Sequence, residues 1–304
     1  MSNSNDNNTL TALSEAMANA VETAGNATVL VNGRRRYPAS GIAYAADLIL
    51  TANHVLEREE DIPVLLPDGS QISASLAGRD PGSDLAVLKL AGTLPVIAQA
   101  ANRQAQVGQL VLALGRPTPE GIQASLGVVS AIGGPVHTRR GGLLERHLRT
   151  DAVPYPGFSG GPLIDSAGQV LGMNTSGLTR GASLAIPVSL AWQIAESLAR
   201  HGSVKRGYLG VRSQPVDIPN PQKESLARSQ ETGLLLVGVE ENSPAEAGGL
   251  MVGDIIVGFA GAPLSEPDEL LTRLTGEVVG KPTPVEVLRG GQLQEITVAI
   301  GDRK

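Results

Sequence analysis

Short runs of apolar and β-branched residues, separated by glycine and proline, recur from about residue 27 to residue 174. Many short strands with turn residues between them favour a closed antiparallel barrel or a pair of packed sheets. Asp68-Gly69 joins two of these runs with a strong hairpin signal. The expected strands are residues 27–31, 40–44, 47–52, 63–66, 71–77, 84–90, 110–114, 124–132, 162–164 and 170–174. We therefore predict a mainly β first domain.

Few helices are expected in this domain. Apolar residues recur at helical spacing over residues 10–22, and residues 187–200 have proline at their start and glycine just after their end. The stretch before residue 10 is rich in Ser and Asn, which is typical of a flexible arm. We expect a flexible arm over residues 1–9 and the first domain over residues 10–202.

A different pattern follows a short linker near residue 203, and 304 residues are enough for two domains. One helix is expected after the capping box formed by Ser243 and Glu246, and a second over residues 267–274. Strands are expected at residues 233–240, 254–259, 283–288 and 294–300. The pattern over residues 203–304 therefore predicts a small α+β sandwich with two helices.

Composition excludes several classes of function. A net charge of −6 offers no basic surface for nucleic acid. Cysteine is absent, which excludes disulfides and thiolate catalysis, and the four histidines are too scattered to indicate a metal site. No apolar segment is long enough to span a membrane. The N-terminus as written shows no signal peptide, so we expect a cytoplasmic protein, with an exported protein lacking its leader as the alternative.

The strongest chemical signal lies in residues 156–163. A serine between glycines on a tight turn can expose its hydroxyl, and the backbone amides beside it can converge on one point. Acyl transfer needs both features, because the oxyanion of the tetrahedral intermediate must meet preorganised donors. Ser159 is the candidate nucleophile, and the amides of Gly157 and Ser159 are the candidate oxyanion hole. The alternative is a glycine-rich turn with an incidental serine.

His54 ends one apolar strand and Asp84 leads into another. Each residue alone is more often structural, but with Ser159 they give the chain order His, Asp, Ser, which is known for catalytic triads. His54 would take the proton of Ser159, and Asp84 would orient the histidine. Asp80 is the rival acid, but the proline and glycine after it suit a turn. An esterase of the α/β-hydrolase type is disfavoured, because its serine would precede the acid and the histidine.

The segments around these three residues resemble the signatures of the HtrA (Deg) family of trypsin-like proteases, which carry a C-terminal PDZ domain. The resemblance rests on Thr-Ala-Asn-His-Val at residues 51–55, Ser-Asp-Leu-Ala-Val-Leu at 83–88, and residues 150–163 with Gly-Phe-Ser-Gly-Gly-Pro-Leu. It extends from about residue 13 to residue 301. It implies two six-stranded β-barrels with His54, Asp84 and Ser159 in the cleft between them, and no cofactor.

Three features depart from the family pattern. The residue before the nucleophile is usually Asn, whereas here it is Phe158, so we expect apolar packing of this side chain to shape the oxyanion hole. The loop over residues 32–40 is short, which argues against the long regulatory loop of some members. Family trimers are held by aromatic residues near the N-terminus, and none precedes Tyr37, so the sequence leaves a homotrimer open.

The resemblance also implies an S1 pocket. Val153, six residues before the nucleophile, would form its base, and Ser183, Leu184 and Ala185 would form a wall. An aspartate at the base would select Arg or Lys, which valine does not. We therefore predict a preference for small or medium aliphatic P1 residues.

Residues 208–211, Tyr208-Leu209-Gly210-Val211, resemble the carboxylate-binding loop of a PDZ domain, and residues 242–256 resemble bacterial PDZ domains. Successive amides in such a loop can bind a C-terminal carboxylate while the peptide extends the sheet edge. The alternative for the loop is a plain strand start. Residues 133–148 match the sensor loop of the family; they either form a solvated surface loop or relay peptide binding to the oxyanion hole.

Two functions follow from these expectations. The first is an ATP-independent serine endopeptidase that degrades unfolded or misfolded proteins and is regulated by C-terminal peptides at its PDZ domain. The second is a chaperone or PDZ scaffold with a latent or inactive protease domain. The complete set of His54, Asp84 and Ser159 favours the first.

Overall fold

The computed structural model describes residues 4–138, 143–178, 184–204, 207–226, 228–274 and 278–302. The chain divides into two compact units, Met1–Ser203 and Val204–Lys304, one residue from the boundary expected from the sequence. Each unit has its own apolar core. None of the helices among the described residues is long and apolar enough to cross a membrane.

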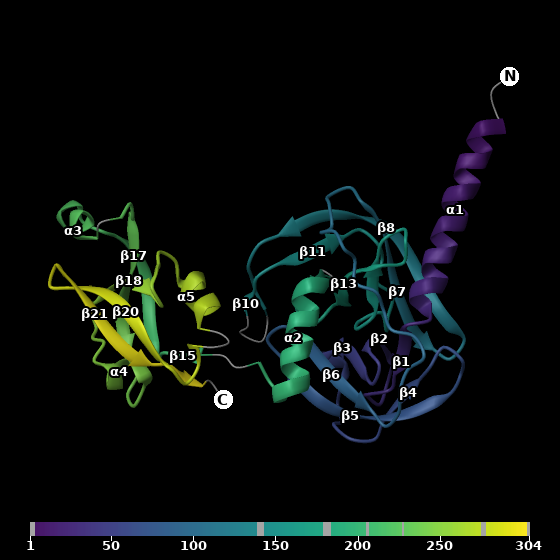
Figure 1. The fold of residues 1–304 in the computed structure, drawn as a ribbon, viewed down its shortest axis with the longest axis horizontal. Helices are drawn as coiled ribbons and strands as arrows, with labels where there is room; N and C mark the ends of the chain where they lie inside the picture. Colours follow the sequence, from purple (N-terminus) through teal and green to yellow (C-terminus); the bar gives the residue numbers. More distant parts are fainter. Residues whose placement is uncertain are drawn as a thin grey trace. The chain divides into compact units, whose positions relative to one another are not determined.

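Two closed six-stranded barrels form the first unit, which confirms the predicted double-barrel architecture (Figure 1). Because each barrel closes on itself, its backbone ladder has no free edge. The first barrel has the order β1 (Thr28–Val31), β2 (Ala39–Ala45), β3 (Leu48–Ala52), β6 (Leu85–Leu90), β5 (Gln71–Asp80), β4 (Ile62–Leu65). The second has the order β11 (His147–Thr150), β14 (Leu184–Pro187), β13 (Val170–Thr175), β12 (Pro162–Ile164), β7 (Leu110–Thr118), β8 (Gly121–Gly133).

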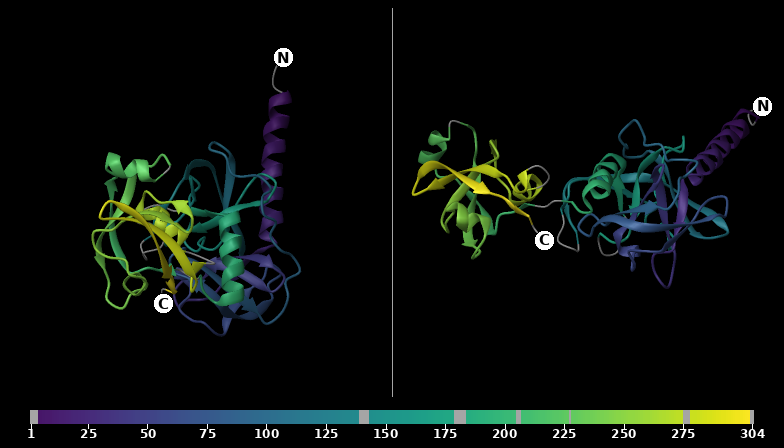
Figure 2. Two further views of the ribbon diagram at one scale, coloured as in Figure 1. Left: turned by 60° about the vertical axis from the view of Figure 1, so that its left-hand side comes forward. Right: turned by 60° about the horizontal axis from the view of Figure 1, so that its bottom comes forward.

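The N-terminal helix α1 (Ser4–Gly25) begins before residue 10, where the sequence placed its start, and it includes residues 4–9 of the expected flexible arm. Side chains of residues 8–16 are exposed, and Ala20 and Ala24 are buried near the C-terminal end of the helix. In Figures 1 and 2 the N-terminal part of α1 projects away from the barrels. Ser, Asn and Asp are favoured at helix starts, and an existing helix extends at little cost per residue. The apolar stripe therefore indicates where the helix packs rather than where it begins.

Arg116 anchors the C-terminal end of α1 to the second barrel. Its side chain is 8% exposed, and it donates hydrogen bonds to the Thr28 carbonyl (2.8 Å, from Nε) and the Gly25 carbonyl (3.1 Å, from Nη2). The carbonyls at a helix C-terminus carry partial negative charge, which favours a cation there. Burial lowers the pKa of Arg116 from its ordinary value, because desolvation disfavours the charged form.

Helix α2 (Val188–His201) closes the first unit and packs against β5, β6 and β13. It begins after Pro187 and ends at Gly202 in the left-handed conformation (φ 74°), as the proline and glycine signals predicted. Between β8 and β11, β9 (Val136–His137) and β10 (Leu143–Leu144) pair as a small two-stranded sheet.

The second unit is built on one antiparallel sheet. Its order is β16 (Val211–Asp217), β17 (Thr232–Val239), β18 (Ile255–Phe259), β20 (Pro282–Arg289), β21 (Gln292–Ala299), with β19 (Ala262–Pro263) paired to β18; β15 (Gly207–Tyr208) pairs with β22 (Gly301–Asp302). The two expected helices are present as α4 (Pro244–Gly248) and α5 (Pro267–Arg273). The Ser243 hydroxyl accepts from the Glu246 amide (3.1 Å), as the capping box predicted. The third helix, α3 (Asn220–Ser225), was not expected, because none of its residues is buried and it therefore leaves no apolar stripe in the sequence.

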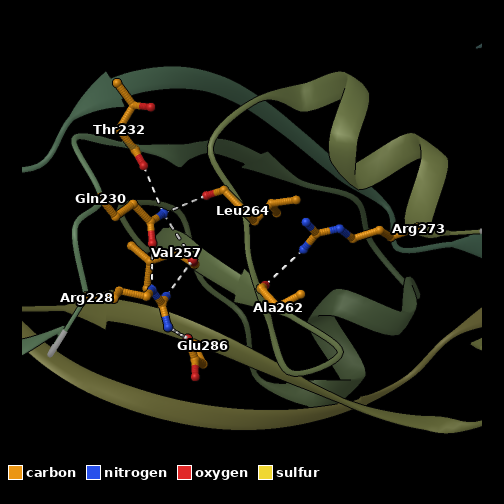
Figure 3. Close-up of polar contacts among 8 residues, drawn as sticks. All are labelled: Arg228, Gln230, Thr232, Val257, Ala262, Leu264, Arg273 and Glu286. Carbon is orange, nitrogen blue, oxygen red and sulfur yellow. Dashed lines mark hydrogen bonds and ion pairs between the residues drawn. The ribbon is translucent and has the colours of Figure 1, made fainter. Parts of the chain in front are cut away.

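Buried polar side chains stabilise a bulge in β18 of the second unit (Figure 3). The bulge includes Val257, whose carbonyl accepts from Arg228 Nη2 (2.7 Å) and Gln230 Nε2 (3.1 Å). Gln230 is 6% exposed and also donates to the Leu264 carbonyl (2.9 Å), while Arg228 forms an ion pair with Glu286 (2.6 Å). Since a buried carbonyl without a partner is costly, the amide of Gln230 contributes to the stability of this unit.

Replacing Gln230 by leucine should lower the free energy of unfolding of the second unit by about 2 kcal/mol, because the Leu264 carbonyl loses the amide that donates to it while the side-chain volume is kept. Hydrogen exchange of peptides from residues 228–302 in increasing urea, on the full chain, measures this loss. Gln294→Leu is the matched control, since Gln294 is exposed on β21. Equal losses in the two variants would contradict the role of Gln230.

Candidate functional site

Pairing of β3 with β6 brings His54 and Asp84 together. The register sets Ala52, the last residue of β3, opposite Leu85, the first residue of β6. His54 follows in the short 3-10 turn η1 (Asn53–Val55), next to the residue that precedes β6. His54 Nδ1 lies 2.7 Å from Asp84 Oδ2, and the His54 amide donates to Asp84 Oδ1 (2.9 Å). These two contacts orient the imidazole with Nδ1 toward the acid, which leaves Nε2 for another partner.

The carboxylate of Asp84 is buried and receives hydrogen bonds from both barrels. Its residue is 2% exposed, and the hydroxyl of Thr175, at the end of β13, donates to Asp84 Oδ2. A Cβ at Gly177 would lie 2.4 Å from Asp84 Oδ2 and 2.5 Å from His54 Nδ1, so this glycine leaves the room that the pair occupies. The Asp84 backbone is left-handed (φ 59°), a conformation that Asp tolerates better than most residues.

Asp80, the rival acid, has a different role. Its carboxylate accepts from the amides of Gly82 (3.1 Å) and Ser83 (3.0 Å), which is the pattern of an Asx turn. Asp84 provides the carboxylate contacts to His54.

Two amides of the glycine-rich loop are free to bind a ligand. Gly157 (φ 90°) and Gly160 (φ 88°) both adopt conformations that favour glycine. The amides of Phe158, Gly160 and Gly161 each donate to a backbone carbonyl at 2.9–3.0 Å. By contrast, the amides of Gly157 and Ser159 have no acceptor within the described parts of the chain. These are the two donors that the sequence predicted for an oxyanion hole.

The Ser159 hydroxyl contacts a second serine. Ser159 Oγ lies 3.1 Å from Ser176 Oγ, and either hydroxyl can donate. Over the residues described, no hydrogen bond joins Ser159 to His54. Hydrogen bonds of catalytic groups are often long or absent without substrate, so this rotamer is compatible with a nucleophile that turns toward His54 when a substrate binds.

Phe158 packs as expected from its apolar character. It is fully buried in the core of the second barrel, and its ring makes an edge-to-face contact with Tyr155 (centroids 5.5 Å apart). A Cβ at Gly115 would lie 2.5 Å from the ring, so the ring lies directly against the β7 backbone. The residue between the two free amides is therefore held by hydrophobic burial.

The residues proposed for the S1 pocket lie in different environments. Leu184 and Ala185 are buried in β14, whereas Val153 is 54% exposed and its amide donates to Ser125 Oγ (2.9 Å). Ser183 lies outside the described residues, and so do residues 139–142 of the expected sensor loop. The predicted aliphatic specificity therefore stays a prediction.

Residues 208–211 form one end of a groove in the second unit. The cavity has a volume of about 200 Å³. Gly210 is left-handed (φ 79°), and in the part of the chain described here the amides of Leu209 and Gly210 donate to no protein acceptor. The lining residues are Gly207, Tyr208, Leu209, Gly210, Val211, Ser213, Glu240, Pro267, Leu270, Leu271 and Leu274. The groove is therefore lined by free amides at one end and by an apolar wall from α5.

Contacts outside the groove fix the loop and the wall helix. The carbonyls of Leu209 and Gly210 accept from the amides of Ala245 (2.9 Å) and Glu240 (2.8 Å). Arg273 at the end of α5 donates to the Ala262 carbonyl (2.9 Å), which ties the helix to β19 (Figure 3). With its carbonyls engaged, the loop presents its amides to the groove.

Three residues that contact the candidate nucleophile or its acid were not predicted from the sequence. Thr175 ends β13 and Ser176 follows it, far along the chain from Asp84, and Ser40 of β2 contacts the loop around Ser159. Only the fold brings these hydroxyls to the site, so no local motif marks them. In the described residues, no group of three or more His, Asp or Glu side chains could hold a metal ion.

Comparisons with known proteins agree with the geometry of both units. Residues 39–173 match the family of trypsin-like peptidase domains, and residues 207–300 match the PDZ domain family. A probable periplasmic serine endoprotease DegP-like of Pseudomonas putida (strain GB-1) is 35% identical over 269 residues, which are 86% of this chain and 55% of that protein. The DegP-like protein of Rhizobium meliloti (strain 1021) is 34% identical over 278 residues, 88% of this chain and 54% of that one. The chain thus spans about 55% of the length of these relatives.

Solved structures match along nearly the whole chain. The HtrA-type protease AlgW with a decapeptide superposes with a TM-score of 0.78 at 30% identity, covering 95% of this chain and 99% of AlgW. A serine endoprotease from Yersinia pestis superposes with a TM-score of 0.77 at 32% identity, covering 95% and 98%.

Thr175→Val should slow the labelling of Ser159 by a fluorophosphonate about 10-fold, because a hydrogen bond to a charged group is worth roughly 1.5–3 kcal/mol. The variant keeps the side-chain shape but removes the donor to Asp84, so the histidine is less firmly oriented. Thr283→Val, a buried threonine of the second unit, is the control and should label at the wild-type rate. An unchanged rate in Thr175→Val would show that the carboxylate does not need this donor.

Proposed function

Because this chain belongs to the HtrA family of trypsin-like serine proteases with a PDZ domain, we propose that it is an ATP-independent serine endopeptidase acting on unfolded or misfolded proteins. The observation that carries the proposal is the hydrogen-bonded pair of His54 and Asp84, in one unit with a loop that contains Ser159 and the free amides of Gly157 and Ser159. The matched proteins are described as proteases, which favours the enzyme over a non-enzymatic scaffold.

The proposed reaction is acyl transfer. Ser159 leaves its contact with Ser176 and turns toward His54 Nε2, which takes its proton as Oγ attacks the scissile carbonyl. His54 then returns the proton to the leaving amine, and water hydrolyses the acyl-enzyme by the same route. Asp84 keeps the imidazole in one tautomer and stabilises the imidazolium. The hydrogen bond that the His54 amide donates to Asp84 Oδ1 holds the acid in position throughout.

The proposed oxyanion hole consists of the amides of Gly157 and Ser159. A negative oxygen develops on the substrate only as the tetrahedral intermediate forms, and donors already aimed at that point need no reorganisation. The lack of protein acceptors for these two amides, among the residues described, supports the assignment. Val153, Leu184 and Ala185 carry no charge, which supports an aliphatic P1 preference.

We propose that the second unit binds C-terminal peptides. The free amides of Leu209 and Gly210 would receive the terminal carboxylate, β16 would pair with the peptide backbone, and the leucines of α5 would take an apolar side chain. A bound peptide would regulate the protease through residues 133–148. That relay and a homotrimer both stay predictions.

The compartment proposed for the protein is the periplasm. The curated relatives are described as periplasmic, and the expectation of a cytoplasmic protein finds no support in the comparisons. A chain without cysteine has no thiol to be oxidised there. Fractionation of the source cells with an antibody to this chain tests the assignment.

Ser159→Ala should abolish the degradation of unfolded casein, because the nucleophile is lost while the binding surfaces remain. The control is Ser166→Ala, which changes an exposed serine in the turn after β12 and should degrade casein at the wild-type rate. Casein fragments separated by electrophoresis, with and without peptides ending in an aliphatic residue, give the readout. Equal degradation by Ser159→Ala and wild type, or none by either, would refute the proposed activity.

Gly210→Ala should weaken peptide binding at the second unit about 10-fold or more. The new Cβ would lie 2.2 Å from the Ser243 Cβ, and a left-handed alanine costs roughly 1–2 kcal/mol, so the loop must shift. Fluorescence anisotropy with a labelled peptide ending in valine, as free acid and as amide, measures binding.

Gly249→Ala is the matched control for this test. Gly249 has a similar φ of 85° but open space around it, so its variant should bind peptide like wild type. Binding of the amidated peptide as tightly as the free acid, or equal weakening in both variants, would contradict the assignment of the loop.

A further inference from the structure

Ser40 joins the two barrels at the loop that carries Ser159. It lies in β2 of the first barrel and is fully buried. Its hydroxyl donates to the Gly157 carbonyl (2.7 Å), and its amide donates to the Ser159 carbonyl (3.2 Å). Thr51 Oγ1 in turn donates to the Ser40 carbonyl (2.7 Å). One residue therefore holds two carbonyls of the candidate nucleophile loop, one on each side of Phe158.

The direction of the Ser40 hydroxyl is set by its neighbours. The Arg116 amide donates to Ser40 Oγ (2.8 Å), so the oxygen acts as acceptor there. A serine hydroxyl has one proton, and the Gly157 carbonyl is the acceptor positioned to receive it. Arg116 is itself fixed by the hydrogen bonds of its guanidinium to Thr28 and Gly25. The donor that meets Gly157 is thus preorganised by the body of the first unit.

Gly157 needs an external restraint because its backbone is soft. A glycine at φ 90° has no Cβ to limit rotation of the peptide planes beside it. The plane between Gly157 and Phe158 is held at both ends, since the Gly157 carbonyl accepts from Ser40 and the Phe158 amide donates to the Tyr155 carbonyl (3.0 Å). Without the hydroxyl, the buried carbonyl would have to turn to find another donor, and Gly157 would turn with it.

We propose that Ser40 is a positioning residue for the oxyanion hole: its hydroxyl fixes the peptide plane at Gly157 and so keeps the Gly157 and Ser159 amides aimed at one point. The inference rests on the proposed function, because it concerns the geometry of that reaction. Among the described residues no hydrogen bond joins Ser40 to His54 or Asp84, and the Ser40 hydroxyl donates to the backbone. It acts on the reaction through Gly157 and Ser159.

The position of these amides matters in the transition state and little in substrate binding. An oxyanion hole whose amides are poorly positioned therefore lowers kcat, while KM stays near its wild-type value. Removal of one oxyanion donor commonly costs about 10²–10³-fold in kcat. Ser40→Ala leaves both donors present but less firmly aimed, so we expect a loss of about 10- to 100-fold in kcat with KM changed less than about twofold.

The experiment compares Ser40→Ala, Ser40→Cys and Thr51→Val in the full chain. A fluorogenic peptide with valine at P1 gives kcat and KM, and each rate is divided by the concentration of sites labelled to completion by a fluorophosphonate. A peptidyl trifluoromethyl ketone, whose adduct carries an oxyanion, should lose affinity by the same factor as kcat/KM. Cysteine keeps the volume but donates weakly, so Ser40→Cys should be impaired to an intermediate degree.

Thr51→Val is the matched control. It removes a buried hydrogen bond of the same length from the Ser40 carbonyl but leaves the Gly157 carbonyl paired. It should lower stability yet keep kcat within about threefold of wild type. Equal kcat losses in Thr51→Val and Ser40→Ala, or a rise in KM with kcat unchanged, would overturn the inference. If wild type hydrolyses the peptide, Ser159→Ala does not, and Ser40→Ala matches wild type, the role of Ser40 fails while the proposed function stands.

Discussion

A buried carboxylate is the constraint on which the first unit depends. Asp84 is 2% exposed, and a charge at that depth is costly unless hydrogen-bond donors surround it. The first barrel supplies the amide and ring of His54, and the second supplies the hydroxyl of Thr175. The charge is therefore fully stabilised only when both barrels are closed and docked. Because the same contacts orient the imidazole of His54, this orientation depends on the docking of the two barrels.

The second constraint is steric, and it falls on the glycines around Ser159. A Cβ at Gly160 would lie 2.1 Å from the Ser40 carbonyl oxygen, and one at Gly161 would lie 2.2 Å from the Leu114 carbonyl oxygen. Both glycines therefore let the loop lie against strands of the two barrels, and Gly160 also has a left-handed backbone (φ 88°). A loop held this closely has few ways to move as a whole. Its remaining freedom is rotation of single peptide planes, which is the motion that the Ser40 hydroxyl restrains.

The difference between local sequence patterns and long-range contacts explains which site residues the sequence could predict. His54, Asp84 and Ser159 each lie in a local pattern whose residue types are dictated by chemistry, and the strand register then brings the first two together. Thr175 and Ser40 lie in ordinary strand sequence, and their roles arise from contacts with residues 91 and 117 positions away. A hydroxyl in a buried strand has no sequence signature of its partner. The three proposed catalytic residues could thus be predicted from local sequence, whereas the residues that position them could be found only from the fold.

Phe158 shows how closely the core and the candidate site are joined. The chain has only two phenylalanines, and both are fully buried, Phe158 in the first unit and Phe259 in the second. Interiors are close-packed, so a ring that lies against Gly115 and Tyr155 cannot shift without moving its own backbone. That backbone lies between the Gly157 and Ser159 amides. The geometry of the proposed oxyanion hole therefore depends on the packing of the second barrel's core and on the Ser40 hydroxyl of the first barrel. Each barrel fixes a different side of the same short loop.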